Sequence, residues 1–172
     1  AKLVHISTDY VFCGAGSAPL SECETPAPKS MYGKTKLLGE EYVRQFCTRW
    51  FVVRTAWLYG YVGKNFVKTV VDDQLGNPTN AADLAHHILK LAVTEEYGVY
   101  HCTGEGVCSW YEFTKEIVRL AGLQATVAPC TSAEYKAAHP AAADRPAWSA
   151  LDNRMLRCTV GDEMRPWKQA LA

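Results

Sequence analysis

The sequence lacks a net charge, a long apolar run and an N-terminal leader pattern. Lysine plus arginine and aspartate plus glutamate number 18 each, so no overall field attracts nucleic acid or an anionic membrane. No apolar run reaches the roughly 18 residues that a membrane-spanning helix needs. The first residues show no charged segment followed by a longer apolar one, so we expect no signal peptide. We therefore expect no nucleic-acid partner, no membrane partner and a cytoplasmic location.

Closely spaced cysteine pairs are also missing. The 172 residues contain seven cysteines, but no C-x-x-C pair and no zinc-ligand spacing. Cys102 falls inside an apolar strand pattern, where a buried thiol behaves as a small hydrophobic side chain. We predict reduced thiols of a cytosolic protein rather than a disulfide framework, and we predict no metal site in this chain.

Apolar residues make up 48% of the sequence and charged residues 21%, as in a soluble globular domain. Hydrophobic patterns predict strands and helices in alternation. We expect strands over 2–7, 50–60, 98–104 and 125–130, and helices over 31–46, 80–96, 110–121 and 165–171, with a loop-rich stretch over 131–155. Ser30, Asn80 and Ser109 are predicted helix caps, and Gly122 is predicted to end the third helix. The alternation predicts βαβ units and a parallel sheet.

The first predicted strand ends in Ser7, Thr8, Asp9 and Tyr10, which bring two hydroxyls, a carboxylate and a phenol in succession. A strand end that only had to turn would use Gly, Asn or Pro. Ligands bind at the carboxyl ends of strands in parallel sheets. This segment and residues 55–59 of the next strand should therefore flank one crevice, although Asp9 alone could still be a turn carboxylate.

Tyr32 and Lys36 stand four residues apart at the start of a predicted helix, so they share a face. An ammonium beside a phenol lowers the phenol pKa from about 10, and such a Tyr can act as a general acid toward a carbonyl oxygen. Thr8 or Ser7 could hold the same oxygen. The simpler interpretation is a surface tyrosine beside a flexible lysine, because Y-x-x-x-K alone is a weak pattern. Its place after the S-T-D-Y strand end favours the catalytic interpretation.

Six segments resemble, in order, the dTDP-4-dehydrorhamnose reductase family of extended short-chain dehydrogenases/reductases. They are HISTDYVF, ETPAPKSMYGKTKLLGEEYV, VVRTAWLYG, GKNFVKTV, VDDQLGNPT and RPAWSALDN. The resemblance implies an α/β fold: a Rossmann-like doubly wound parallel sheet, its N-terminal half missing from this chain, with a small C-terminal substrate-binding domain. We assign residues 1–62 and 81–105 to the NAD(P)-binding domain, and 63–80 and 106–172 to the substrate-binding portion.

The same resemblance implies reduction of the 4-keto group of dTDP-4-dehydro-L-rhamnose to dTDP-L-rhamnose, with NADPH or NADH as the cofactor. Thr8, Tyr32 and Lys36 would form the catalytic triad. Tyr32 would supply the proton, Lys36 would hold the nicotinamide ribose and keep Tyr32 acidic, and Thr8 would orient the carbonyl. The resemblance also allows for a homodimer and for Mg²⁺ at a dimer interface, neither of which the sequence determines.

Substrate contacts carry over to four positions. Thr8 and Asp9 would touch the substrate, while Tyr10 and Trp57 would line the sugar–nucleotide pocket. Arg145 could meet the diphosphate as a fork-shaped donor. The simpler alternatives are an aromatic core residue for Trp57 and a solvated loop residue for Arg145.

The sequence departs from the family pattern in three places. Cys13 follows "YVF" where the family usually has Asp. There is no G-x-x-G-x-x-G turn, which lets the backbone approach a pyrophosphate. The segment "FVKTV" runs directly into "VDDQLG". We therefore expect further residues before Ala1 and between Val70 and Val71. We also expect the 172 residues alone neither to bind NADPH nor to reduce a substrate.

Two other functions remain open. A sugar-nucleotide 4,6-dehydratase or 4-epimerase is the first, but a dehydratase would need a second carboxylate where Tyr10 follows Asp9. A non-catalytic regulatory subunit resembling the beta subunit of methionine adenosyltransferase is the second, because that family shares the "STDYVF" and "YGKTK" segments. "RTAWLYG" with Trp57 favours the reductase, and a turnover assay separates the alternatives.

Overall fold

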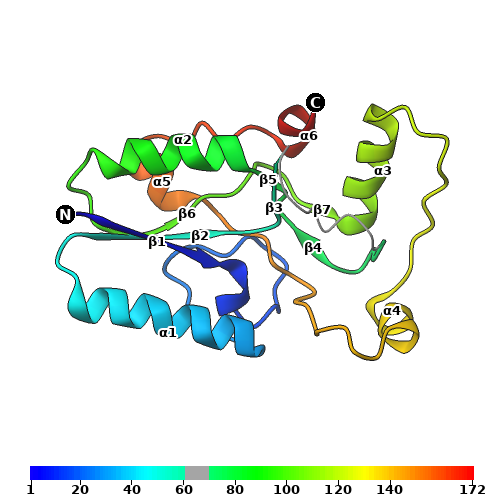
Figure 1. The fold of residues 1–172 in the computed structure, drawn as a ribbon, viewed down its shortest axis with the longest axis horizontal. Coiled ribbons are helices and arrows are strands. Elements are labelled where there is room, and N and C mark those ends of the chain that lie inside the picture. Colours follow the sequence, from blue (N-terminus) through cyan, green and yellow to red (C-terminus); the bar gives the residue numbers. More distant parts are fainter. Residues whose placement is uncertain (61–69) are drawn as a thin grey trace.

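A parallel sheet carries the fold in the computed structural model, which describes residues 1–60 and 70–172 (Figure 1). Strands β1 (Leu3–Thr8), β2 (Trp50–Thr55) and β6 (Gly98–His101) form a three-stranded sheet in the order β1-β2-β6. Both pairings are parallel, and the register places Thr8 opposite Thr55. The predicted parallel sheet is confirmed, and β1 and β2 end at the same edge.

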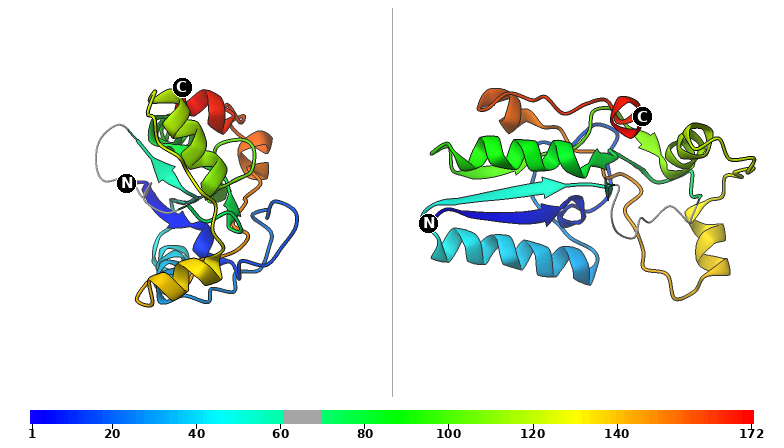
Figure 2. Two further views of the ribbon diagram at one scale, coloured as in Figure 1. Left: turned by 90° about the vertical axis from the view of Figure 1, so that its right-hand side faces the viewer. Right: turned by 45° about the horizontal axis from the view of Figure 1, so that its top comes forward.

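Helices cover both faces of this sheet. Helix α1 (Met31–Phe46) lies on one face and α2 (Ala81–Ala92) on the other, as the views of Figures 1 and 2 agree. Side chains of β2 alternate between the layers: Phe51 and Val53 join the apolar core beneath α2, whereas Arg54 bonds to α1. This three-layer arrangement is the Rossmann-like fold that the sequence predicted.

The predicted helix caps are confirmed, although α2 ends at Ala92, four residues before the predicted end at 96 (96 − 92). The Ser30 hydroxyl accepts a hydrogen bond from the Gly33 N–H at 3.0 Å and so caps α1. Ser109 forms a capping box with Glu112 at the start of α3 (Trp110–Leu120). Gly122 has a φ of +63°, and its N–H bonds to the Arg119 carbonyl, which closes that helix with a left-handed turn.

Three predictions of secondary structure were wrong. The segment 50–60 is broken after Thr55 and resumes as β3 (Leu58–Tyr59), because Trp57 adopts a left-handed backbone with a φ of +46°. The segment 125–130 forms no strand, because it is largely exposed and only Cys130 pairs with another backbone, at Val71. The stretch 131–155 contains α4 (Ser132–Ala138), opened by a capping box.

The remaining elements are short. They are η1 (Asp9–Val11), β4 (Leu75–Gly76), β5 (Thr79–Asn80), β7 (Cys108–Ser109), α5 (Arg154–Cys158) and α6 (Trp167–Leu171). Strand β3 pairs in parallel with β5, and β4 pairs antiparallel with β7. These pairs attach α3 and α6 beyond the carboxyl edge of the main sheet (Figure 1). The predicted C-terminal helix is confirmed as α6.

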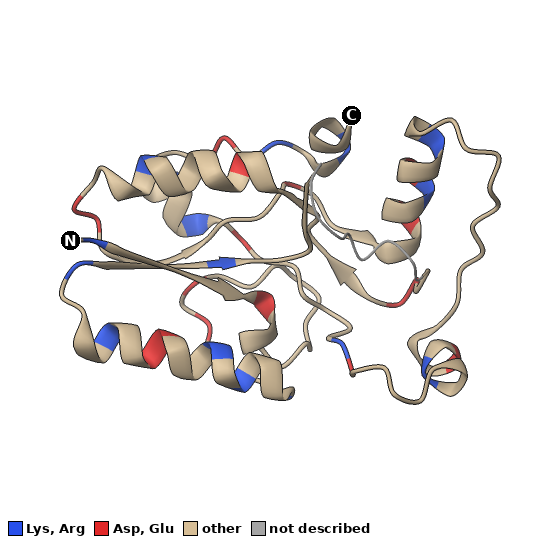
Figure 3. Cartoon of the chain, in the orientation of Figure 1, with Lys and Arg blue, Asp and Glu red and all other residues tan. Residues whose placement is uncertain are grey.

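Charges of both signs are spread over the helical layers (Figure 3). No helix in the described ranges is long and apolar enough to cross a membrane. All seven cysteines lie in these ranges as free thiols, as predicted. Within residues 1–60 and 70–172, no cluster of three or more His, Cys, Asp or Glu side chains could hold a metal ion.

The division into an NAD(P)-binding and a substrate-binding portion stays a prediction. Its first boundary, between residues 62 and 63, falls within 61–69, which lie outside the described residues. Extra residues between Val70 and Val71 also stay a prediction. On either side of this junction the backbone pairs with Cys130, which donates to the Val70 carbonyl and accepts from the Asp72 N–H.

Candidate active site

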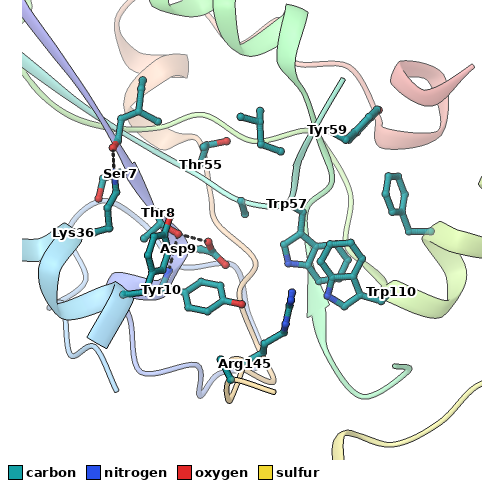
Figure 4. Close-up of a pocket in the computed structure, with 16 residues that line it drawn as sticks. Ser7, Thr8, Asp9, Tyr10, Lys36, Thr55, Trp57, Tyr59, Trp110 and Arg145 are labelled. Atoms are coloured by element: carbon teal, nitrogen blue, oxygen red, sulfur yellow. Dashed lines mark hydrogen bonds between the residues drawn. The ribbon is translucent and has the colours of Figure 1, made fainter. Parts of the chain in front are cut away.

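A cleft of about 510 Å³ opens at the carboxyl edge of the main sheet (Figure 4). One side, which we call the polar wall, consists of Thr8, Asp9, Tyr10, Tyr32 and Lys36. The opposite side, the aromatic wall, consists of Trp57, Tyr59, Trp110 and Phe113. Arg145 lies between the two walls, with its side chain directed into the cleft (Figure 4).

The end of β1 builds the centre of the polar wall. Thr8 caps η1, and its hydroxyl donates to Asp9 Oδ1 at 2.9 Å while accepting weakly from the Tyr10 N–H at 3.4 Å. Asp9 is only 3% exposed, and its second oxygen, Oδ2, is buried with no hydrogen-bond partner among the described residues. Burial raises the Asp9 pKa to about 7, against the hydroxyls of Thr8 and Ser149, which lower it.

Ser7 turns away from this role. Its hydroxyl donates to Glu40 Oε1 at 2.6 Å, beneath α1, so its one hydrogen is already used. The Thr8 hydroxyl hydrogen is committed in the same way, to Asp9, so the two hydroxyls differ in their partners: Asp9 lines the cleft, whereas Glu40 is fully buried behind the polar wall. The sequence also allowed Asp9 to be a carboxylate that only holds a turn. Because the hydrogen-bonded Thr8 and Asp9 both line the cleft, Asp9 also contributes to the cleft surface.

The first turns of α1 bring Tyr32 and Lys36 to the same cleft. The Tyr32 ring is 54% exposed and meets the Tyr10 ring edge-on, with centroids 5.6 Å apart. Lys36 Nζ donates to the Ile6 carbonyl at 2.6 Å, which fixes the ammonium against β1. Gly33 permits this close approach, because a Cβ there would lie 2.1 Å from the Tyr10 carbonyl oxygen.

A buried ion pair holds α1 against the sheet behind the polar wall. Arg54 and Glu40 are 1% and 0% exposed, and two hydrogen bonds of 2.9 and 2.7 Å join them in a fork. Arg44 adds a more exposed contact to the same carboxylate at 3.2 Å. With the bond from Ser7, this network ties β1, β2 and α1 together one turn beyond Lys36. It therefore sets where the Tyr32 and Lys36 side chains lie.

The aromatic wall is held mainly by ring contacts. The Trp57 and Trp110 indoles stack with centroids 3.8 Å apart and planes 10° apart. Trp110 and Tyr59 each contact the Phe113 ring. The left-handed backbone of Trp57 turns its indole out of the strand direction, and the indole N–H donates to Ser149 Oγ at 3.1 Å. Trp57 therefore lines the cleft and also packs against the buried cluster around Phe113, so its role stays a prediction.

Arg145 links the cleft to a second hollow of about 450 Å³, which Tyr10, Arg145 and Lys29 help to line. Burial raises the Tyr10 pKa to about 12, and the nearby Arg145 guanidinium works in the opposite direction. Tyr10 therefore stays a neutral phenol and a hydrogen-bond donor. Arg145 thus lines both hollows, and its role toward a diphosphate stays a prediction.

All seven site residues named from the sequence line the one cleft: Thr8, Asp9, Tyr10, Tyr32, Lys36, Trp57 and Arg145. Their individual roles stay predictions. Sequence reasoning missed Trp110 and Phe113, although their i, i+3 spacing after the Ser109 capping box was a usable signal. It also missed Glu40 and Ser149, for which no local pattern exists, because their partners are far away in the sequence.

The chain is similar to a protein family and to several known proteins over nearly its whole length. The family model described as "RmlD substrate binding domain" matches residues 1–172. The spore coat polysaccharide biosynthesis protein SpsK of Bacillus subtilis is 41% identical over 183 aligned residues, which cover 99% of the chain and 62% of that protein. The dTDP-4-dehydrorhamnose reductase of Aggregatibacter actinomycetemcomitans is 35% identical, over 99% of the chain and 65% of its own length.

Solved structures agree. A dTDP-4-dehydrorhamnose reductase from Bacillus anthracis in complex with NADP has a TM-score of 0.93 and 43% identity, covering 99% of the chain and 64% of its own. The chain thus spans less than two thirds of the length of each of these relatives. The alignment with SpsK has 11 more positions than the chain has residues (183 − 172), so that relative carries insertions within the matched span. The chain belongs to the RmlD substrate-binding domain family.

Proposed function

We propose that this chain forms the catalytic and substrate-binding part of an NAD(P)H-dependent reductase. The reaction is reduction of the 4-keto group of dTDP-4-dehydro-L-rhamnose to dTDP-L-rhamnose. The observation that carries the proposal is the convergence of Thr8, Tyr32 and Lys36 on one cleft, opposite a stacked pair of indoles. The names of several relatives support the same substrate and reaction.

The polar wall supplies the groups that a ketone reduction needs. The half-exposed Tyr32 phenol can donate a proton to the oxygen as it becomes an alcohol. Lys36 stands one helical turn away on the same face of α1, where the Ile6 carbonyl holds its ammonium beside the cleft. The Thr8 hydroxyl, at the strand end between them and the aromatic wall, holds the carbonyl oxygen in place.

The residues present fit the nicotinamide end of the cofactor. One N–H of the Lys36 ammonium is bound to Ile6, and its other donors have no partner among the described residues, so they can bond ribose hydroxyls. The cofactor, when bound, supplies the hydride. The Gly-rich turn that commonly holds the pyrophosphate of such a cofactor does not occur in this sequence.

The aromatic wall and Arg145 fit a nucleotide sugar. Indole faces pack well against the apolar C–H face of a sugar ring, and Trp57 and Trp110 present an extended aromatic surface to the cleft. Arg145 can bind a diphosphate through its fork of donors, with Lys29 farther along in the adjoining hollow. The sugar would then lie between the two walls and the nucleotide beyond Arg145.

A cytoplasmic location belongs to the same proposal. The seven free cysteines suit a reducing compartment, and none of the described helices can cross a membrane. A homodimer and an interfacial Mg²⁺ stay predictions, to be tested by the mass of the complete protein in solution with and without a chelator.

Turnover by the complete protein tests the proposed function. We expect oxidation of NADPH that depends on dTDP-4-dehydro-L-rhamnose and yields dTDP-L-rhamnose. A protein that binds the nucleotide sugar but never oxidises NADPH would be a regulatory subunit instead. Water loss or epimerisation of a nucleotide sugar without net consumption of NADPH would identify a dehydratase or an epimerase.

A further inference from the structure

The Thr8–Asp9 pair contains an unusual hydrogen-bond arrangement. Thr8 has a single hydroxyl hydrogen, and with Asp9 ionised this hydrogen points to Asp9 Oδ1 at 2.9 Å. Only lone pairs of Thr8 then face the cleft. A ketone oxygen is an acceptor and needs a donor, so Thr8 cannot hold it in this state.

Protonation of Asp9 reverses the arrangement. A carboxylic acid is a donor as well as an acceptor, so Asp9 can donate to the Thr8 oxygen and release the Thr8 hydrogen toward the cleft. The proton must lie on Oδ1, the oxygen 2.9 Å from the Thr8 hydroxyl, while Asp9 is 3% exposed and Oδ2 is buried without a hydrogen-bond partner among the described residues. An ionised carboxylate with an unpartnered buried oxygen is unfavourable, whereas the acid form relieves that cost.

We propose that Asp9 is a positioning residue whose protonation releases the Thr8 hydroxyl hydrogen to bind the keto oxygen of the substrate. The inference rests on the proposed function, because it assigns Thr8 to the carbonyl. One proton from solvent binds the Asp9 carboxylate as the ketone binds. The alcohol product carries its own hydrogen, which it can donate to Thr8 when Asp9 is ionised. Binding of the ketone is therefore accompanied by proton uptake. Binding of the alcohol is accompanied by much less proton uptake.

The surroundings of Asp9 place this event near neutral pH. Burial raises the Asp9 pKa to about 7, and the hydrogen bond from Thr8 is the largest opposing effect. The other titratable or charged groups on the cleft are Tyr10 on η1, Tyr32 and Lys36 on α1, Tyr59 on β3 and Arg145 in the loop before Ser149. Tyr10 stays neutral, Lys36 is bonded to Ile6, and Arg145 lies against Tyr10 rather than Asp9.

The test is equilibrium binding of dTDP-4-dehydro-L-rhamnose to the complete protein saturated with NADP⁺, which cannot react with it. The Kd for the ketone should rise about three- to tenfold between pH 6 and pH 8.5, the range expected for one neutral hydrogen bond. The Kd for dTDP-L-rhamnose should change less than twofold. Calorimetry in buffers of different ionisation enthalpy should show proton uptake with the ketone only.

Two variants locate the effect. Asp9→Asn keeps an N–H donor for Thr8 at every pH, so ketone binding should be tight and independent of pH. Thr8→Val removes the hydroxyl and should also remove the pH dependence, although Asp9 still titrates. Glu41→Gln makes the same charge change on the exposed side of α1 and should leave the wild-type profile unchanged.

The outcomes separate this inference from the proposed function. If the wild type turns over the ketone but Asp9→Asn shows the wild-type pH dependence, the switch is wrong and the reductase stands. Persistence of the dependence in Thr8→Val would mean that Asp9 acts directly on the ligand, which also overturns the inference. Absence of both ketone binding and turnover in the wild type would overturn the proposed function itself.

Discussion

The polar wall and the aromatic wall enclose the same cleft but are fixed by different forces. On the polar wall, Thr8 is bonded to Asp9 and Lys36 is bonded to Ile6, so each position depends on a directional hydrogen bond. On the aromatic wall, Trp57 and Trp110 depend mainly on stacking, with one hydrogen bond from Trp57 to Ser149. Directional bonds orient a reacting atom, whereas stacked rings provide a surface that holds a ligand in several orientations.

This difference predicts how substitutions divide. Changes on the polar wall should act on the rate or on its dependence on pH, because they move or remove the groups that meet the carbonyl. Changes on the aromatic wall should act on affinity and stability. Each prediction below tests that division in the complete protein.

The largest expected effect comes from the ion pair behind the polar wall. Arg54→Met leaves Glu40 buried without its forked partner, and we expect a loss of about 3–5 kcal/mol in the free energy of unfolding. Urea denaturation measures it. Arg44→Met is the matched control: Arg44 contacts the same carboxylate but is 38% exposed, so the loss should stay below about 1 kcal/mol. Equal losses would show that the buried pair has no special part in holding the wall.

Asp9 gives the next largest effect, and its sign depends on pH. The folded-state pKa of about 7 lies above the ordinary value of 3.8, so the folded form binds the proton more tightly than the unfolded form. Stability from this group is thus present at low pH and falls as pH rises from about 4 to about 7. Relative to the wild type, Asp9→Asn should gain roughly 4 kcal/mol over that range, from the 1.36 kcal/mol that each pKa unit represents.

Urea denaturation of both proteins at a series of pH values tests this expectation, because the other titrating groups are common to the pair. A constant difference between wild type and Asp9→Asn across that range would mean that Asp9 is ionised throughout. The protonation switch on the polar wall would then have no basis.

Tyr32→Phe should lower kcat by about 10²-fold or more, the effect of losing a positioned general acid. KM for the nucleotide sugar should change far less, because Phe keeps the ring that contacts Tyr10. Tyr42→Phe is the control, since Tyr42 lies on the same helix and is 53% exposed, close to the 54% of Tyr32. Near-normal turnover by Tyr32→Phe would remove Tyr32 from the mechanism.

The smallest effect concerns the left-handed backbone of Trp57. At a φ of +46° an alanine is strained and a glycine is not, so Trp57→Gly should be more stable than Trp57→Ala by about 1 kcal/mol. At Phe113, inside α3, the order should reverse, because glycine is the poorer helix former. Both Trp57 variants should raise KM for the nucleotide sugar more than they lower kcat. A fall in kcat alone would contradict the division between the walls.

The sequence predicted the polar wall better than the aromatic wall for a physical reason. Thr8, Asp9 and Tyr10 are consecutive, and Tyr32 and Lys36 are one helical turn apart, so local geometry alone puts each group on one side. The Trp57–Trp110 stack joins residues 53 positions apart (110 − 57), and no local rule relates them. The break after Thr55 was missed because the segment 50–60 is rich in β-branched and aromatic residues, which favours an unbroken strand.

The buried Arg54–Glu40 pair was also missed because its two residues meet only in the folded chain. The β-branched and aromatic residues of 50–53 predicted a strand, but Arg54 after them did not reveal its partner. Glu40 becomes that partner only when α1 packs on the sheet. The segment 125–130 has strand-like residues but no neighbouring strand to pair with, and α4 depends on a capping box inside a stretch rich in loop residues.

A structure of the complete protein with NADP⁺ and dTDP-L-rhamnose tests the central claim most directly. The account predicts the sugar between the two walls, with its O4 atom within about 2.6–3.2 Å of both the Tyr32 phenol and the Thr8 hydroxyl, the reach of a hydrogen bond. An indole of the aromatic wall should lie against the ring, and Arg145 should lie beside the diphosphate. A sugar bound with O4 toward Trp57, or bound outside the cleft, would contradict the account.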